Sequence, residues 1–208
     1  MPISDLEFIY FDDSLLVVNK PAGLLAVPGR GADKQDCLSA RIQKEFPDAL
    51  VVHRLDMATS GLMVFARGAE MQSRLSQMFR EREVEKRYVA VVAGKVEPPI
   101  GEVSLPIVAD WPNRPLRKID AVLGKPSLTR YCLIAHDVDA HTSRVVLEPV
   151  TGRTHQLRVH MASIGHSILG DALYGGSAAK RLLLHASMLS FAHPLSGELL
   201  TLVSEAPF

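Results

Sequence analysis

Residues 51–66 read VVHRLDMATSGLMVFA and pass from an apolar pair through a polar segment into an unbroken apolar run. The run Leu62–Ala66 is short and wholly apolar, so it predicts a buried strand. After Gly68, four apolar residues recur at helical spacing with charged residues between them: Met71, Leu75, Met78 and Phe79. This stripe predicts an amphipathic helix that packs on the core directly after the strand.

Further elements are predicted on both sides of this strand and helix. Strands are expected at 15–20, 88–94, 129–136, 144–148, 182–191 and 199–203, which makes about seven strands with Leu62–Ala66. A helix at 37–46 would have Asp36 as its N-cap, and Thr154 would cap a third helix that runs through Leu157, Met161 and Ile164 and ends near Gly165. Since the strands come in runs, the pattern favours an α+β fold with a mixed, largely antiparallel central sheet and flanking helices and loops.

The segment from Pro98 to Pro126 is predicted to be a long loop. It contains six prolines and few apolar runs, and a loop of this length is either functional or mobile. Basic residues concentrate in it and just beyond it, at Arg114, Arg117, Lys118, Lys125 and Arg130. The local charge is compatible with a phosphate-binding face, and equally with scattered solvated side chains.

Composition excludes several classes of protein. A formal net charge of zero argues against a uniformly basic nucleic-acid binder, and the chain has no apolar run long enough to cross a membrane. The first residues do not resemble a secretory signal. The two cysteines, Cys37 and Cys132, predict reduced, buried thiols in a cytoplasmic protein. The spacing of His155, His160 and His166 matches no zinc-protease pattern, so these residues are expected to contact RNA or pack locally and not to form a metal site.

The segment 51–61 contains the strongest candidate for catalysis, Asp56. A carboxylate on a short segment between two strands can be held rigidly and act as a base or a nucleophile. The alternative is a surface turn that Asp56 only caps. A kinase catalytic loop is rejected because Leu55 separates Arg54 from Asp56 and no glycine-rich phosphate loop precedes them.

Two further segments offer partners for such a carboxylate. Arg153 follows the turn Thr151-Gly152 at the expected start of a helix, and an arginine there could hold a carboxylate ionised or simply face solvent. Tyr88 opens a strand after Lys86 and Arg87, where it could stack on a nucleobase or be an ordinary core tyrosine.

Taken together, these segments resemble the pseudouridine synthases of the family typified by ribosomal large subunit pseudouridine synthase A. The matching segments follow the family's order along almost the whole chain: Asn19-Lys20-Pro21-Ala22-Gly23-Leu24, His53-Arg54-Leu55-Asp56 with Thr59-Ser60-Gly61, Lys86-Arg87-Tyr88, Thr151-Gly152-Arg153 with His155–His160, Leu169-Gly170-Asp171 with Tyr174, and Leu183-Leu184-His185-Ala186. The first segment begins at residue 19, so we expect a single catalytic domain at 1–208 without an N-terminal accessory RNA-binding domain.

The resemblance implies an activity and a set of roles. The family breaks the N1–C1′ bond of uridine, rotates the uracil and rejoins it through C5, without a cofactor or metal. Asp56 would be the catalytic aspartate, and Arg153 would pair with it. Tyr88 would stack on the target base, and Arg54 would help hold that base out of its stack or occupy the space it leaves. His53 and Leu183 would complete the RNA-binding set. In the proline-rich segment 98–126, Arg114, Arg117 and Lys118 could grip the RNA backbone, and Trp111 could stack or anchor the loop. The implied partners are 23S rRNA and a tRNA anticodon stem-loop, bound by a monomer.

Other functions remain open from sequence. A paralogue could isomerise a different tRNA or rRNA uridine. A non-catalytic RNA-binding module could retain the fold, although such a module has no need of Asp56, Tyr88 and Arg153 together. An unrelated glycosyl-bond hydrolase would release free uracil, but hydrolases of this kind usually need two carboxylates.

Overall fold

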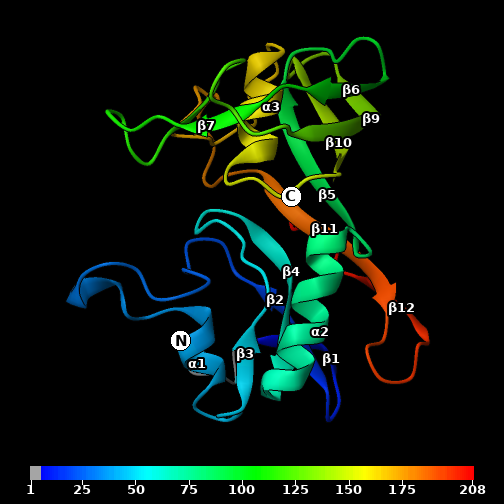
Figure 1. The fold of residues 1–208 in the computed structure, drawn as a ribbon. Helices are drawn as coiled ribbons and strands as arrows, with labels where there is room; N and C mark the ends of the chain where they lie inside the picture. Colours follow the sequence, from blue (N-terminus) through cyan, green and yellow to red (C-terminus); the bar gives the residue numbers. More distant parts are fainter. Residues whose placement is uncertain (1–5) are drawn as a thin grey trace. The chain divides into compact units, whose positions relative to one another are not determined.

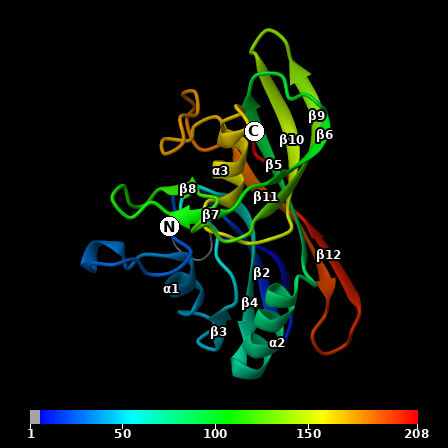
Figure 2. The same ribbon diagram turned by 45° about the horizontal axis from the view of Figure 1, so that its top comes forward.

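The computed structural model describes residues 6–208, which divide into two compact units. Unit 1 comprises the chain up to Lys86 together with His185–Pro207, and unit 2 comprises Arg87–Leu184 together with Phe208. Figures 1 and 2 show the elements of each unit in two views. The fold is α+β with mixed, largely antiparallel sheet structure, as the sequence predicted.

Unit 1 is built on a mixed sheet. Its strands pair in the order β1 (Glu7–Phe11), β2 (Leu15–Lys20), β4 (Ser60–Arg67) and β11 (Leu184–Ala192), while β3 (Ala49–Val51) also pairs with β4 and β12 (Leu199–Val203) with β11. Every pairing among them is antiparallel except that of β4 with β11, which is parallel. The strands predicted at 15–20, 62–66 and 199–203 are confirmed, and the one predicted at 182–191 is found at Leu184–Ala192.

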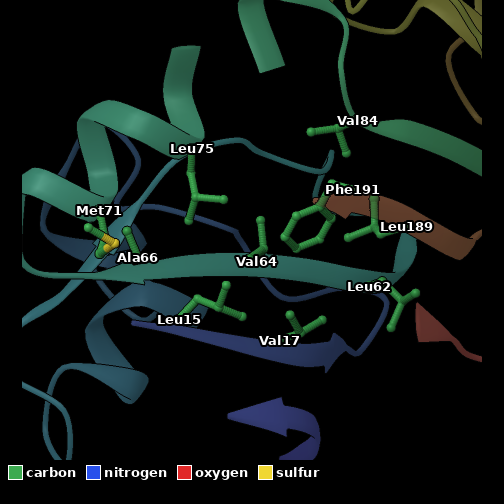
Figure 3. Close-up of a cluster of buried hydrophobic side chains, with 10 residues drawn as sticks. All are labelled: Leu15, Val17, Leu62, Val64, Ala66, Met71, Leu75, Val84, Leu189 and Phe191. Atoms are coloured by element: carbon green, nitrogen blue, oxygen red, sulfur yellow. The ribbon is translucent and has the colours of Figure 1, made fainter. Parts of the chain in front are cut away.

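The core of unit 1 forms where α2 (Gly68–Glu81) packs on this sheet. Figure 3 shows Met71 and Leu75 pointing from the helix toward β4, with Phe191 of β11 beside Val64. All ten cluster residues are buried: Leu15, Val17, Leu62, Val64, Ala66, Met71, Leu75, Val84, Leu189 and Phe191. Each large apolar side chain removed from water contributes about 1.5–3 kcal/mol, so the predicted stripe of α2 is a main source of stability.

The first helix differs from its prediction. α1 (Leu38–Ile42) is shorter than 37–46, and its N-cap is Cys37, whose Sγ accepts a hydrogen bond from the Ala40 amide at 3.4 Å. Asp36 is not the cap, because its carboxylate is engaged by the Arg41 guanidinium at 2.6 and 2.7 Å. A short 3₁₀ turn, η2 (Ala32–Lys34), precedes this helix.

The two cysteines lie in different environments. Cys37 is buried, as predicted, and both thiols are free. Cys132 is exposed, so the prediction of two buried thiols is wrong for it. The reason is strand alternation: Cys132 follows buried Tyr131 on a strand, and successive side chains point to opposite faces.

Unit 2 contains an antiparallel sheet and one helix. Its strands pair in the order β5 (Glu85–Ala93), β10 (Thr142–Pro149), β9 (Leu128–Asp137) and β6 (Ile100–Ser104). A separate antiparallel hairpin is formed by β7 (Ile107–Ala109) and β8 (Arg117–Ile119), and Figure 2 shows it beside the helix α3 (Gln156–Ser163). The predicted pairing of the strands near 129–136 and 144–148 is confirmed.

The segment 98–126 is not the long irregular loop that was predicted, because it contains β6, β7 and β8. All six of its prolines lie outside these strands, where the missing amide costs no ladder hydrogen bond. With β1 and β3, these three short strands raise the count in residues 6–208 to twelve, against about seven predicted. No helix in the described part of the chain is long and apolar enough to cross a membrane.

The third helix also begins differently. α3 starts at Gln156, and its N-cap is His155 in the left-handed conformation, with φ 57° and no side-chain cap. Thr154 therefore does not cap the helix. The last helical residue is Ser163, and the C-cap Ile164 is followed by Gly165 at φ +87°, so the end predicted near Gly165 is confirmed.

Candidate functional site

Asp56 lies in unit 1 on the segment between β3 and β4. Its side chain is half-buried, between exposed Arg54 and Met57 and next to buried Leu55. The Asp56 carbonyl accepts a hydrogen bond from the Thr59 amide at 3.1 Å, which closes a tight turn. The Met57 carbonyl accepts one from the Gly23 amide at 2.8 Å. The segment is therefore tied both to itself and to the turn that follows β2.

A buried lysine strengthens this attachment. Lys20 is the last residue of β2 and has no solvent exposure. Its Nζ donates to the carbonyls of Pro21 at 2.9 Å, Leu24 at 2.8 Å and Met57 at 3.2 Å. An ammonium has three donors, and three backbone acceptors satisfy all of them. Lys20 thus holds the chain after β2 against the residue next to Asp56.

His53 fixes the first part of the same segment. Its Nε2 accepts a hydrogen bond from the Val64 amide at 3.0 Å, so the proton of the neutral ring is on Nδ1. The ring stacks on Phe79 of α2, with centroids 4.5 Å apart and planes at 19°. Burial, and to a smaller extent the charge of Lys86, lower the pKa of His53 to about 3.

We therefore expect His53 to remain uncharged across the physiological range. An unfolded histidine takes up its proton near pH 6.5 and folded His53 only near pH 3, so this residue contributes stability above pH 6.5 that is lost progressively between those values. The check is a ¹H–¹⁵N NMR titration of the ring nitrogens from pH 8 to 4.5. A midpoint for His53 above pH 5.5 would contradict the expectation.

Beyond Asp56, the segment joins β4 at buried Thr59 and Ser60. The Ser60 hydroxyl lies 2.8 Å from Nδ1 of His185, and Nε2 of His185 lies 3.1 Å from the Ser204 hydroxyl. Gly61 follows at φ +114°, where an added Cβ would lie only 2.3 Å from the Ala186 carbonyl oxygen. The two backbones are therefore in direct contact at this point.

In unit 2, the turn before α3 presents Arg153 at the surface. Buried Gln156 organises the turn: its Oε1 accepts from the Arg153 amide at 3.0 Å and from the Thr151 hydroxyl at 2.7 Å. The Gln156 Nε2 donates to the Leu128 carbonyl and the Thr129 hydroxyl, at 2.9 and 3.0 Å. The backbone that carries the Arg153 side chain is therefore fixed, while the residue itself is exposed.

The start of α3 is joined to the β7–β8 hairpin by Tyr174. The phenol hydroxyl accepts from the Arg117 amide of β8 at 2.9 Å and pairs with Nδ1 of His155 at 2.7 Å. Behind it, Arg158 and Asp171 form a buried bidentate ion pair at 2.8 and 2.7 Å. The Arg158 guanidinium also lies 5.2 Å from the centroid of the Tyr174 ring.

The tip of the hairpin presents an exposed aromatic side chain with a cation on its face. Trp111 is 66% exposed, and Cζ of Arg114 lies 3.4 Å from the centroid of the indole. A guanidinium stacked on an indole offers both charge and a flat surface, a combination found where proteins bind single-stranded nucleic acid.

The remaining candidates lie on other elements of unit 2. Tyr88 is half-buried on β5, opposite Leu147 of β10. Leu183 is half-buried just before β11, and its backbone pairs with Leu169 and Val91 at 2.9 and 3.1 Å. The structure thus brings His53, Arg54 and Asp56 together in one segment, and Trp111 with Arg114 in one stack.

Sequence reasoning missed the side chains that support these segments. Lys20 and His185 lie within motifs that resemble the family, but no role was predicted for either. Gln156 was likewise quoted only as part of a motif. Their neighbours in the motifs were the only signal available, since each also bonds to a residue distant in sequence: Lys20 to Met57, Gln156 to Leu128 and Thr129, and His185 to Ser60. Among residues 6–208, no group of three or more His, Cys, Asp or Glu side chains is arranged to hold a metal ion.

Comparison with known proteins gives consistent matches. Residues 14–163 match the family model described as RNA pseudouridylate synthase. The chain is 49% identical over 207 residues to the dual-specificity RNA pseudouridine synthase RluA of Escherichia coli K12, covering 98% of this chain and 94% of that one. The RluA of Haemophilus influenzae is 46% identical with the same coverage. A solved structure, human RNA pseudouridylate synthase domain containing 1, superposes with a TM-score of 0.82 at 29% identity, covering 100% of this chain and 86% of that one.

Proposed function

Since the chain belongs to the RluA family of RNA pseudouridine synthases, it is an isomerase acting on uridine in RNA, and we propose that it modifies both a tRNA anticodon stem-loop and 23S rRNA. The observation that carries the proposal is the identity of 49% across nearly the whole length of a relative named as dual-specificity. Those targets are the ones that the sequence resemblance implies.

Asp56 is proposed as the catalytic residue. A uridine in a structured RNA hides its glycosidic bond, so the nucleotide has to leave its stack before any group can reach the sugar. Asp56 either attacks C1′, forming an ester bond that breaks when C5 bonds to C1′, or removes the C2′ proton, which is returned in that later step. In both cases the N1–C1′ bond breaks and the rotated uracil rejoins through C5. C5 then loses its proton and N1 gains one, so the product is an isomer of the substrate. The network of Lys20, Gly23 and Thr59 supports this role, because a reacting group has to be held in one position.

The roles of the other site residues are proposed from the sequence motifs that they share with the family. Solvent exposure supports the role of Arg54. Arg54 is exposed beside Asp56, so its guanidinium is available to hold the flipped nucleotide. Tyr88 is proposed to stack on the target base and Leu183 to contact it. Arg153 is proposed as the cationic partner of the catalytic carboxylate. His53 serves the RNA site indirectly, since its ring is engaged with Val64 and Phe79.

We further propose that residues 1–208 act as one catalytic domain, as a cytoplasmic monomer that needs neither cofactor nor metal. An isomerisation leaves the atoms and the redox state of the substrate unchanged, so the overall reaction requires no co-substrate. Size-exclusion chromatography with light scattering tests whether the protein is a monomer. Assays after extensive dialysis against EDTA test whether activity needs a metal.

The stacked pair at the hairpin tip is expected to bind RNA. Trp111→Ala and Arg114→Ala should each weaken RNA affinity, and only Arg114→Ala should reduce the slope of log K against log salt, by about 0.7–0.9 for one lost phosphate contact. The loss of stacking should cost about 1–3 kcal/mol of binding energy in the Trp111 variant. Filter binding at several salt concentrations measures both quantities.

Lys95→Ala is the matched control for the hairpin, because Lys95 is an exposed cation of the same unit that pairs with Glu97. If the two hairpin variants bind RNA as the control does, with the same salt slope, the hairpin is not part of the RNA interface.

The target proposal is tested by pseudouridine mapping. Purified protein is incubated with a uridine-containing tRNA anticodon stem-loop and with 23S rRNA, and modified positions are compared with those missing in a strain that lacks the gene. Product in both RNAs supports dual specificity. Product in one alone, or at another position, identifies a paralogue with different targets. Free uracil in place of pseudouridine would indicate glycosyl-bond hydrolysis.

A further inference from the structure

Three buried, hydrogen-bonded side chains lie at the C-terminal end of the segment between β3 and β4 that carries Asp56 (the Asp56 segment). Ser60, His185 and Ser204 are 3%, 1% and 7% exposed, and both ring nitrogens of His185 face a hydroxyl, at 2.8 Å for Ser60 and 3.1 Å for Ser204. Each hydroxyl can donate or accept a hydrogen bond. Both hydrogen bonds of the His185 ring can therefore form whichever of its two nitrogens carries the proton. Polar groups this deeply buried are costly unless they are paired, and their pairing therefore fixes their positions.

The backbones are fixed at the same point. His185 is opposite Ser60 and Ala186 is opposite Gly61 in the parallel pairing of β11 with β4. Gly61 has no room for a Cβ against the Ala186 backbone, so the two strands lie closer here than a residue with a side chain would allow. Ser204 is itself anchored, because its amide donates to the Ser187 carbonyl at 2.9 Å. Ser60 is thus held through its side chain and its strand.

The anchored residue is close to the proposed catalytic carboxylate. Thr59 precedes Ser60, and the Thr59 amide donates to the carbonyl of Asp56 at 3.1 Å. One hydrogen-bonded turn therefore separates the Ser60–His185 contact from Asp56. A lateral movement of Ser60 would displace this turn, and with it the carboxylate.

We infer that His185 is a positioning residue for catalysis, which holds the C-terminal end of the Asp56 segment through Ser60. This inference rests on the proposed catalytic role of Asp56. His185 itself has 1% exposure and is therefore not a group that contacts RNA. Its effect is on the placement of the carboxylate, and displacements of about 1 Å at a reacting group reduce rates by up to about 100-fold.

Two amide substitutions separate the two contacts of the ring. The side chain of Asn places a polar atom near the position of Nδ1, and that of Gln places one near Nε2. His185→Asn can therefore keep the contact with Ser60, whereas His185→Gln keeps the contact with Ser204. We expect the single-turnover rate of pseudouridine formation to fall about tenfold in His185→Gln and in Ser60→Ala, and to be largely retained in His185→Asn. RNA affinity should stay within about twofold of wild type throughout.

The design distinguishes positioning from simple stabilisation. Thermal unfolding of each variant sets an assay temperature well below its midpoint, and Ser60→Ala, the smallest change, remains informative if a His185 variant does not fold. The double variant Ser60→Ala/His185→Gln should be no slower than the slower single variant, because both changes remove the same contact.

Wild-type rates in folded Ser60→Ala and His185→Gln would overturn the inference, and so would equal losses in His185→Asn and His185→Gln with Ser60→Ala unaffected. Asp56→Asn is assayed in parallel. If Asp56→Asn is active, the proposed role of Asp56 fails. If it is inactive while the Ser60 and His185 variants are fully active, only the positioning inference fails.

Discussion

Replacing Asp56 by Asn should abolish pseudouridine formation while leaving RNA binding intact. The two side chains are nearly isosteric, but an amide can neither attack C1′ nor accept the C2′ proton. The segment that carries the residue is held by backbone contacts of Asp56 and Met57, which the substitution does not touch. Single-turnover assays with excess enzyme measure the chemical step directly, and filter binding measures affinity.

The size of the loss carries information about the mechanism. Removal of a general base typically costs on the order of 10²–10⁴-fold in rate, and removal of a covalent nucleophile can cost on the order of 10⁶-fold. Asp13→Asn is the control, since Asp13 is an exposed carboxylate of the same unit with only a distant contact to Arg67 at 3.9 Å. Substantial activity in Asp56→Asn would show that another group performs the chemistry.

Replacing Arg158 by Met should produce the largest loss of stability among the variants considered. The Arg158 and Asp171 side chains are 6% and 0% exposed, so removing the guanidinium leaves a buried carboxylate without its charged partner. Breaking a buried pair in this way costs about 3–5 kcal/mol in the free energy of unfolding. Urea denaturation at pH 7 measures the change, and the double variant Arg158→Met/Asp171→Leu should recover part of it.

The same pair predicts an acid dependence. Burial opposes ionisation of Asp171, but the hydrogen bonds and charge of Arg158, with the amides of Leu173 and Tyr174, lower its pKa below the ordinary 3.8. The unfolded chain then takes up this proton at a higher pH than the folded protein. The stabilisation is complete above pH 3.8 or so and is lost as the pH falls through the lowered pKa.

Arg130→Met is the matched control for Arg158→Met. Arg130 is half-exposed and pairs with Glu102 and Glu148 at 3.1 and 3.4 Å, and pairs of this kind contribute little. If Arg158→Met and Arg130→Met have the same effect on unfolding, the buried pair has no special structural importance.

Elements with a complete local signal could be predicted from the sequence. The apolar run of β4 and the stripe of α2 each bury a face that is visible in a few consecutive residues, and both were found where predicted. The short strands β6, β7 and β8 carry no such signal. Each has three to five residues, and their pairings with β9 or with one another decide their conformation.

The helix caps show the same limit. Asp36 and Thr154 are good cap residues by type, but the Asp36 carboxylate is taken by Arg41 and the start of α3 is set by Gln156 and the left-handed His155. In the site, the polar motif around Asp56 could be singled out from residue types. The contact of Ser60 with His185 joins residues 125 positions apart, and no local pattern encodes it.

Unit 1 is discontinuous in sequence, and this has a consequence for the order of folding. Leu189 and Phe191, which complete its core with Leu15 and Val64, belong to the segment that follows the whole of Arg87–Leu184. During synthesis from the N-terminus, the apolar face of α2 and β4 therefore emerges long before the strand that finishes its burial. The pairings of β5 with β10, of β10 with β9 and of β9 with β6 all lie within Arg87–Leu184. Unit 1, in contrast, must close a loop of about a hundred residues, and the entropic cost of that closure is offset only when its final strands pack.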